Sequence, residues 1–181
     1  WIQEATPIQP ASYNRTVSDA ERATDRFTAN GGIGIVLRFG SLYGPDALTQ
    51  ELIGMVRKGW SPLPGSPAAY YSSVAQSDAA SAVVATLGVP AGTYNVVDDE
   101  PLTRREFCDS IASSLGVKPP RFLPAWLTSH MGSTMECLSR SQRVSNWKIR
   151  EATRWKPHYA SVRDGWPVVL ENLKSSASSP R

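Results

Sequence analysis

The sequence has few residues of the kinds that build metal centres and disulfide frameworks. Its 181 residues include two cysteines, Cys108 and Cys137, and two histidines, His130 and His158. The cysteines lie far apart and neither belongs to a C-x-x-C pair, and neither histidine has a partner at ligand spacing, so we expect no metal site. This spacing favours two buried, reduced thiols and a cytoplasmic location.

Long apolar runs and clusters of like charge are also scarce. No run approaches the ~20 apolar residues that a membrane span needs, and no apolar segment behind a basic start marks a signal peptide. The net charge is +3, and the 19 Lys and Arg are spread out, with higher density only around residues 140–154. A solvated basic face explains that density better than a nucleic-acid interface does. We therefore expect partners to include neither a membrane nor a nucleic acid.

What the sequence does contain is an alternation of short apolar runs with amphipathic segments. Residues 33–39 (IGIVLRF) and 93–97 (TYNVV) predict strands, and the first reads as buried on both faces of a parallel sheet. Helical periodicity predicts the helices, which begin near Thr16, Asp46, Ser77, Thr103, Ala125, Thr134, Asn146 and Ser161. This alternation argues for an α/β fold with parallel pairing. Because two parallel strands do not make a stable sheet, the chain reads as the second part of a larger domain.

Two of these helix starts have the spacing of a capping box, in which a hydroxyl and a carboxylate satisfy free backbone amides. They are Thr16 with Asp19, and Thr103 with Glu106. Asp78 is expected to cap its own helix or to lie in the first turn, where the helix dipole favours an acid.

Four stretches then follow in a characteristic order: YNRTVSDAERATDRF, IVLRFGSLYGPD, SSVAQSDAASAV and GTYNVVDDEPLTRREF. In this order they resemble the C-terminal half of an NAD(P)-dependent epimerase/dehydratase, an extended short-chain dehydrogenase/reductase. The stretch LRFGSLYGP is similar to the family's LRPxNxYGP and is the most specific piece. The resemblance runs from about Glu4 to Leu173. It implies an α/β fold that comprises the C-terminal part of a Rossmann-like parallel sheet and a small, mostly helical substrate domain, without the N-terminal nucleotide-binding half.

The resemblance also divides the chain. Residues 1–58 correspond to the last helix, strand and helix of a Rossmann-like domain, and 59–173 to a mainly substrate-binding domain with one returning strand at 93–97. Residues 174–181 are expected to be a disordered tail. The chain starts at Trp1, and the glycine-rich G-x-x-G-x-x-G turn that holds a pyrophosphate is absent. We therefore expect a missing N-terminal half, or another copy of the chain, to cover the sheet edge.

The family opens the helix after its fifth strand with Tyr-x-x-x-Lys, and Tyr13 occupies the tyrosine position. The resemblance implies that Tyr13 is catalytic, as general base or acid on a substrate hydroxyl or carbonyl. The lysine position holds Val17, which can neither lower the tyrosine pKa nor hold the nicotinamide ribose. Three interpretations stay open: altered chemistry, dinucleotide binding without turnover, and a tyrosine that only introduces the helix.

Two further sets of residues follow from the resemblance. Phe39, Gly40 and Ser41 resemble the loop that passes the nicotinamide, so they are candidates for cofactor binding; a turn that needs glycine is the alternative. Arg140 and Arg143 lie where relatives gather substrate-contacting groups, and a guanidinium suits a phosphate or a carboxylate. A solvated basic face is the alternative for both arginines.

The expected function is that of a C-terminal fragment of an NAD(P)-dependent oxidoreductase, epimerase or dehydratase. NAD or NADP would bind the full-length protein, and the small-molecule substrate would carry a hydroxyl or a carbonyl, with a nucleotide sugar as one candidate. The fragment alone is expected to be inactive. The alternative, which the loss of the lysine favours, is a non-catalytic dinucleotide-binding sensor or assembly factor of the same fold.

Overall fold

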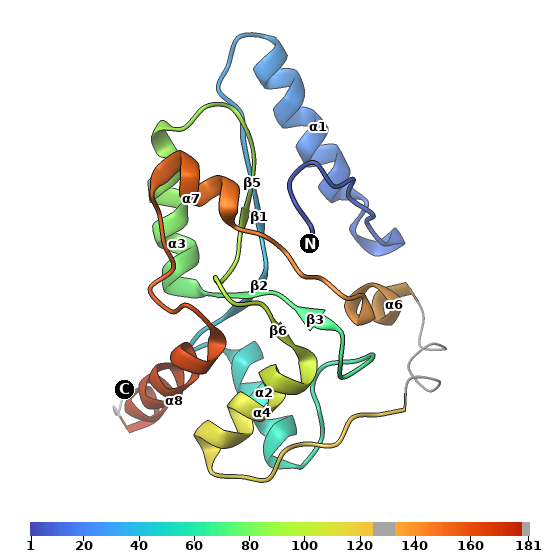
Figure 1. The fold of residues 1–181 in the computed structure, drawn as a ribbon, viewed down its shortest axis with the longest axis vertical. Coiled ribbons are helices and arrows are strands. Elements are labelled where there is room, and N and C mark those ends of the chain that lie inside the picture. The colour runs from blue at the N-terminus through green and yellow to red at the C-terminus, as the bar shows by residue number, and fades with distance from the viewer. Residues whose placement is uncertain (125–132, 179–181) are drawn as a thin grey trace.

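The computed structural model describes residues 1–124 and 133–178. At its centre, β1 (Ile35–Phe39) lies parallel to β5 (Gly92–Val96). Helices α3 (Gln76–Ala85) and α7 (Trp147–Thr153) cover one face of this pair, and α1 (Thr16–Ala29) lies on the other side (Figure 1). The prediction of an α/β fold with parallel strands is confirmed.

A helical unit forms the other end of the molecule (Figure 1). Helices α2 (Ala47–Arg57), α4 (Arg104–Leu115) and α8 (Val162–Ser178) pack around one buried apolar cluster. Two short strand pairs connect this unit to the centre: β2 (Ser41–Tyr43) with β4 (Ser73–Ala75), which are parallel, and β3 (Tyr70–Tyr71) with β6 (Leu102–Thr103), which are antiparallel. The remaining elements are η1 (Ser12–Asn14), η2 (Thr86–Gly88) and α6 (Ser133–Ser139).

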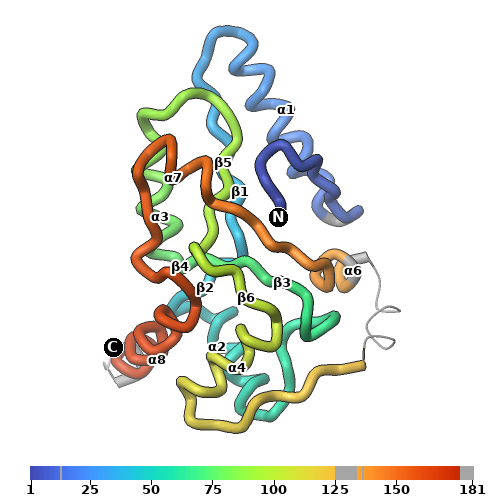
Figure 2. The backbone as a smooth tube through the Cα atoms, in the orientation of Figure 1, coloured from blue at the N-terminus to red at the C-terminus, as the bar shows by residue number. Residues whose placement is uncertain are grey.

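The N-terminal segment is tied to a distant part of the chain. The backbone N–H of Ile2 donates to the carbonyl of Arg143 over 2.7 Å, and the N–H of Ser145 donates to the carbonyl of Ile2 over 2.9 Å. Figure 2 shows this first segment beside α1 and the stretch that links α6 to α7. Residues 2 and 143–145 thus lie together although the sequence separates them widely.

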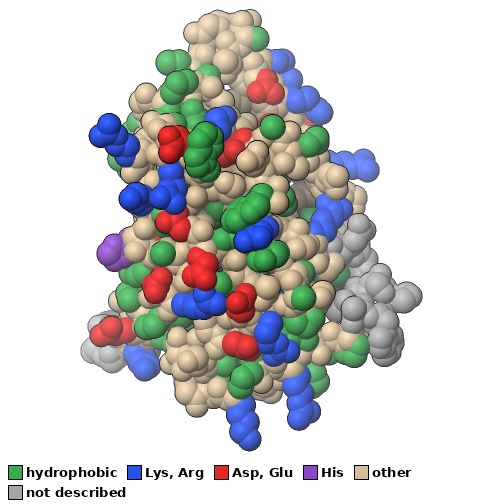
Figure 3. Space-filling model, viewed as in Figure 1, with side chains coloured by type: hydrophobic (Ala, Val, Ile, Leu, Met, Phe, Trp, Pro, Cys, Tyr) green, Lys and Arg blue, Asp and Glu red, His purple; other side chains and the backbone are tan. Residues whose placement is uncertain are grey.

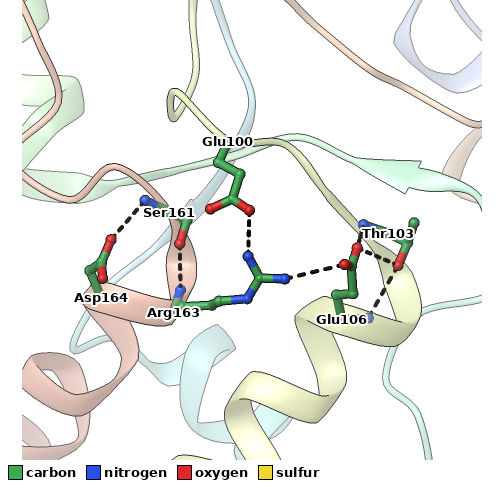
Figure 4. A network of polar contacts seen from close by, with 6 residues as sticks. All are labelled: Glu100, Thr103, Glu106, Ser161, Arg163 and Asp164. Carbon is green, nitrogen blue, oxygen red and sulfur yellow. Dashed lines mark hydrogen bonds and ion pairs between the residues drawn. The ribbon is translucent and has the colours of Figure 1, made fainter.

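Helix α4 begins with the predicted capping box. Thr103 accepts a bond from the N–H of Glu106 over 3.3 Å, and the Glu106 carboxylate accepts one from the N–H of Thr103 over 2.8 Å. The Arg163 guanidinium of α8 contacts the same carboxylate over 3.2 Å and Glu100 over 2.5 Å (Figure 4). These bonds lower the pKa of Glu106, chiefly through the Thr103 amide, and they join the starts of α4 and α8.

The capping box predicted at Thr16 is wrong, and of the two alternatives for Asp78 the structure has the first-turn acid and not the cap. Helix α1 starts without a side-chain cap, and Asp19 contacts Arg22 instead of closing a box with Thr16. Helix α3 has Ala75 at its N-cap, and the buried Asp78 lies in its first turn, where it accepts the backbone N–H groups of residues 158 and 159 over 3.0 and 3.1 Å. A carboxylate that finds amides on another segment has no need of its own helix terminus.

The predicted burial of β1 on both faces is also wrong. Its residues are partly buried or exposed, and Phe39 is 41% exposed. Ile35 and Leu37 pack on one face against a buried cluster that includes Tyr94 and Val96 of β5. The other face carries Arg38, so the strand alternates instead of being apolar throughout.

The two edges of the β1–β5 pair differ. Gly92 donates to the carbonyl of Gly34, and Gly40 donates to that of Val96. In a parallel pair these two bonds fix the direction of every N–H and C=O group. The groups of residues 93, 95 and 97 point away from β1, and the groups of residues 35, 37 and 39 point away from β5.

Three of the outer backbone groups along β5 and the residue after it are occupied by side chains. Lys148 donates to the carbonyl of Thr93, Glu4 accepts from the N–H of Asn95, and Asn146 donates to the carbonyl of Val97, over 2.8, 2.9 and 2.9 Å. In the described part of the chain, no strand lies beside β1 on its outer side. The sheet is therefore closed at β5 and open at β1.

Three other expectations concern the second half of the chain. The helix expected from Ala125 falls outside the described residues, whereas the one expected near Thr134 is α6. Helix α8 continues to Ser178, so residues 174–178 are helical and not part of a disordered tail; residues 179–181 lie outside the description. None of the helices in the described ranges combines the length and apolarity that crossing a bilayer takes.

Both cysteines are free. Cys108 is fully buried, and burial raises the pKa of its thiol to about 11, whereas Cys137 is partly exposed. On the face drawn in Figure 3, acidic and basic side chains are interspersed, so this face carries no large patch of one sign.

Candidate functional site

A cavity of about 520 Å³ lies between the start of α1, the end of β1 and the segment around residues 137–144. Three parts of the sequence that are far apart thus build one wall. Its apolar part comprises Ile2, Pro7, Ile8, Pro10, Val17, Phe39, Val97 and Val144. Its polar part includes Asn14, Glu21, Arg38, Asn95, Arg140 and Gln142.

Helix α1 contributes its first two turns to the cavity, and η1 contributes Asn14. Val17 and Glu21 line the wall, and their spacing of four residues places them on one face of α1. The carboxylate of Glu21 accepts two bonds from the Arg38 guanidinium, both over 2.8 Å. The Glu21 hydrogen bond raises the pKa of Arg38, and this partly buried pair fixes α1 against β1.

Two amide side chains in the wall keep a polar atom without a partner. Asn95 is 2% exposed, and its Nδ2 makes no hydrogen bond, although its backbone N–H donates to Glu4. The Oδ1 of Asn14 is likewise buried and unpartnered. Asn95 Nδ2 and Asn14 Oδ1 are thus one buried donor and one buried acceptor without a partner, and each costs free energy.

The three residues expected at the nicotinamide are placed differently. Phe39 and Gly40 line the cavity, whereas Ser41 does not, and its Oγ accepts a bond from the Tyr71 hydroxyl over 2.5 Å. A Cβ on Gly40 would come within 2.8 Å of the carbonyl oxygen of Ser72 and 2.9 Å of the Val97 side chain. Packing within the chain thus requires this glycine.

The two expected substrate arginines are separated. Arg140 lines the cavity, and its Nη1 donates to the carbonyl of Gln9 over 2.6 Å. Arg143 does not line it; its guanidinium lies 4.1 Å from the ring centre of Trp1 and 4.6 Å from that of Tyr70. The structure therefore brings Arg140 together with Phe39 and Gly40, and places Arg143 in an aromatic stack elsewhere.

Tyr13 lies in η1, directly before the face of α1 that lines the cavity. Its side chain is not among those that the structure describes. Val17 is 45% exposed and lies in the cavity wall, one helical turn after Tyr13. The catalytic role of Tyr13 stays a prediction.

A buried arginine that the sequence reasoning missed supports the segment with Arg140. Arg104 is 1% exposed, and its Nη2 donates to the carbonyls of Leu138 and Arg140 over 2.7 and 2.8 Å. Burial lowers the pKa of this guanidinium. Asn95 was also missed, although a polar residue between the apolar Tyr94 and Val96 of a strand signals the opposite face of the sheet.

A second polar group lies between the end of β5 and the start of β4. Asp98 is 3% exposed, its Oδ2 accepts a bond from Ser73 over 3.1 Å, and its Oδ1 is buried without a partner. Burial, with a smaller contribution from the Asp78 carboxylate, raises the pKa of Asp98 to about 8. In the described ranges, no cluster of three or more His, Cys, Asp and Glu side chains could hold a metal ion.

No protein-family model matches the sequence. Among curated proteins, a 3-diazoavenalumate denitrifying reductase of a Streptomyces species is similar, with 34% identity over 167 residues. The match covers 86% of this chain and 52% of that protein, so the chain spans about half the length of the curated relative that it matches.

Two solved structures show the fold. The human epimerase family protein SDR39U1, solved with NADPH, has a TM-score of 0.78 and 20% identity, over 95% of this chain and 60% of its own. The dTDP-glucose 4,6-dehydratase of Bacillus anthracis, solved with NAD, has a TM-score of 0.72 and 18% identity, over 97% and 56%. The resemblance read from the sequence is thereby confirmed for the fold: the chain shares the Rossmann-like architecture of epimerases and dehydratases over part of their length.

Proposed function

We propose that this chain, with the fold of the NAD(P)-dependent epimerases and dehydratases, is the C-terminal part of an oxidoreductase that acts on a hydroxyl or carbonyl group. The observation that carries the proposal is the cavity, because it joins Val17 of α1, Phe39 and Gly40 at the end of β1, and Arg140. Val17, Phe39 and Gly40 come from two of the sequence stretches that resemble the family. The reductase name of the curated relative supports the same reaction class.

The residues present fit one end of the cofactor. Phe39 and Val17 offer apolar surface and Gly40 offers main chain, which together suit a flat nicotinamide ring. The sequence has no glycine-rich turn for the pyrophosphate, so the chain would hold the nicotinamide end of NAD or NADP and not the phosphates. Bound there, the dinucleotide supplies the hydride donor or acceptor. The proposed role of Tyr13 is to move a proton to or from the substrate oxygen.

The open edge of β1 supports the proposal that a further part of the protein, or another copy, completes the sheet. The N–H and C=O groups of Ile35, Leu37 and Phe39 point outward, and no described strand pairs with them. Such an edge is a template for strand addition. The free Cys108 and Cys137 support the proposed cytoplasmic location.

Nicotinamide mononucleotide tests the cofactor site on the chain as it stands. At millimolar concentration it should shift the amide NMR signals of Val17, Phe39 and Gly40, while those of α8 stay unchanged. Signals that move only outside the cavity, or none at all, would refute the nicotinamide site.

The valine at position 17, where the family has a lysine, favours a second candidate: a dinucleotide-binding sensor or assembly factor that does not convert a substrate. Val17→Lys in the full-length protein should raise the rate of NADPH oxidation with aldehydes and ketones by roughly tenfold or more, because the ammonium lowers the pKa of a phenol one turn away. Val17→Met is the matched control without charge. Equal rates in both variants and the parent protein would favour the sensor.

A further inference from the structure

Two residues of the cavity wall come directly before a buried polar contact. Ser72 and Val97 line the cavity, and Ser73 and Asp98 follow them in the chain. The N–H of Asp98 donates to the carbonyl of Ser73 over 2.8 Å, and the Ser73 hydroxyl donates to Oδ2 of Asp98 over 3.1 Å. We call these four residues the β4–β5 junction, because they connect the start of β4 with the end of β5.

The β4–β5 junction also holds other parts of the cavity wall. A Cβ on Gly40 would lie 2.8 Å from the carbonyl oxygen of Ser72 and 2.9 Å from the Val97 side chain, so Gly40 packs closely against both. The Ser72 hydroxyl accepts a bond from the N–H of Val144 over 3.0 Å and donates one to the carbonyl of Gln142 over 2.9 Å. A shift of the junction would therefore move several parts of the wall together.

The Asp98 carboxyl in this junction is buried without a compensating positive charge. Its side chain is 3% exposed, and Oδ1 has no hydrogen-bond partner, so the Ser73 hydroxyl is the one described group that donates to the carboxyl. A single hydroxyl does not replace the water that an ionised carboxylate loses on burial. The geometry therefore favours the protonated, neutral form of Asp98.

The ionisable groups around Asp98 strengthen this preference. They come from β2, α3, the residue after Asp98 and α8, and they are Tyr43, Asp78, Asp99 and Asp164. Asp99 already has a partner in Arg150, over 3.0 Å. Ionisation of Asp98 would bury a second charge near Asp78, and burial, with a smaller contribution from Asp78, raises the pKa of Asp98 to about 8. Burial also raises the pKa of Tyr43, so this phenol stays neutral where Asp98 titrates.

We propose, on the basis of the cofactor site above, that Asp98 is a positioning residue which makes ligand binding in the cavity depend on pH. The protonated carboxyl keeps the β4–β5 junction closed and thereby fixes Ser72, Val97 and Gly40 in the wall. The ionised carboxylate regains water only by moving away from Ser73, and the wall residues move with it. Asp98 itself touches no ligand and acts through the residues beside it.

A pH titration of the ligand-free chain, followed by ¹³C NMR signals, tests the coupling. The carboxyl carbon of Asp98 should titrate with a midpoint of about 8, and the backbone carbons of Gly40, Ser72 and Val97 should shift with the same midpoint. In Asp98→Asn, whose side chain keeps its shape but cannot ionise, the three wall residues should not shift in this range. An Asp98 midpoint near the ordinary value of about 4, or wall signals that do not follow the carboxyl, would overturn the proposal.

Three further variants keep this test decisive. The Ser73 hydroxyl bond lowers the pKa of Asp98, so Ser73→Ala should raise the midpoints of the carboxyl and of the wall signals together. A carboxyl midpoint that moves alone would contradict the coupling. Asp25→Asn, at an exposed position of α1, is the matched control and should keep the shifts. The thiol of Cys137 also lines the cavity, and loss of the shifts in Cys137→Ser would assign them to the thiol and not to Asp98.

Nicotinamide mononucleotide measures the effect on binding. Its phosphate is ionised above about pH 7, so the charge of the probe stays nearly constant in the range that matters. Its affinity should fall about tenfold between about pH 7 and pH 9 in the parent chain, and by less than about twofold in Asp98→Asn. By linkage, saturation with the probe should raise the Asp98 midpoint by about one unit.

The two proposals fail in different ways. Binding of nicotinamide mononucleotide in the cavity with equal affinity at pH 7 and pH 9 would overturn the role of Asp98 and leave the cofactor site intact. No binding in the cavity at pH 7 would refute the cofactor site, and the shifts of Gly40, Ser72 and Val97 in the ligand-free chain would still decide whether Asp98 positions the wall.

Discussion

The helical unit and helix α1 bury their apolar side chains very differently. In α4, Phe107, Cys108 and Ile111 are at most 1% exposed, and Trp166 of α8 is fully buried against them. Helix α1 buries no residue, and its Phe27 is 58% exposed. Packing therefore stabilises the helical unit, whereas polar bonds such as Arg38 to Glu21 hold α1 in place. Three changes probe this contrast.

The largest effect is expected from Trp166→Ala. Its ring lies 5.5 Å from that of Tyr43 and 5.9 Å from that of Phe107, so removing it leaves a cavity in the centre of the helical unit. We expect a loss of about 3–5 kcal/mol in the free energy of unfolding, measured by urea denaturation. Phe27→Ala in α1 is the control, with an expected change within about 0.5 kcal/mol. Similar losses in both variants would remove the contrast between the helical unit and α1.

The next effect is that of pH on the buried Asp98. Its pKa is raised from 3.8 to about 8, so the folded state binds a proton that the unfolded state releases between these values. The stabilisation that the protonated Asp98 gives to the folded state is therefore fully present below pH 4, and it is lost as the pH rises through 8. Asp98→Asn should remove this loss and gain roughly 3 kcal/mol at pH 9 relative to the parent chain, with little change at pH 4. Denaturation curves at both pH values check the sign.

The control for that experiment is Asp25→Asn, at an exposed position of α1. It should leave the difference between pH 4 and pH 9 unchanged. An Asp98→Asn chain that is less stable than the parent at pH 9 would mean that the ionised carboxylate is required in the fold.

The smallest effect is expected at the starts of α4 and α1, which have the same capping-box spacing in the sequence. Thr103→Ala removes a capping box that is present and should cost about 1 kcal/mol. Thr16→Ala alters a helix that starts without a side-chain cap, so its cost should fall below about 0.3 kcal/mol. The two variants need the same denaturation assay. Equal costs would show that the cap at Thr16 forms in solution.

These cases also show what could be predicted from the sequence. The capping box at Thr103 was predictable because both of its partners lie within four residues, and so was the strand at 93–97, which forms β5 at 92–96. The position of Asp78 in the first turn of α3 was one of two predicted alternatives, but its partners could not be predicted, because the amides of residues 158 and 159 lie far along the chain. A short sequence pattern predicts hydrogen bonds between neighbouring residues, but it gives no information on a competing partner that lies far along the chain.

The candidate site shows the same limit. The resemblance pointed to Phe39, Gly40 and Arg140, and these residues do line one cavity. The resemblance could not show that Arg143 lies outside the cavity, because the stacking of Arg143 on Trp1 and Tyr70 depends on how the N-terminus packs. Asn95 became visible only once β5 was placed beside β1, with one of its faces toward the cavity.

The side chains that occupy the outer edge of β5 have a consequence for assembly. Because Lys148, Glu4 and Asn146 already satisfy its backbone groups, a foreign strand could bind there only by displacing all three. Of the two edges of the β1–β5 pair, only that of β1 is thus left to another strand, so contact through it joins two molecules and leaves no second edge of this pair from which a fibre could grow.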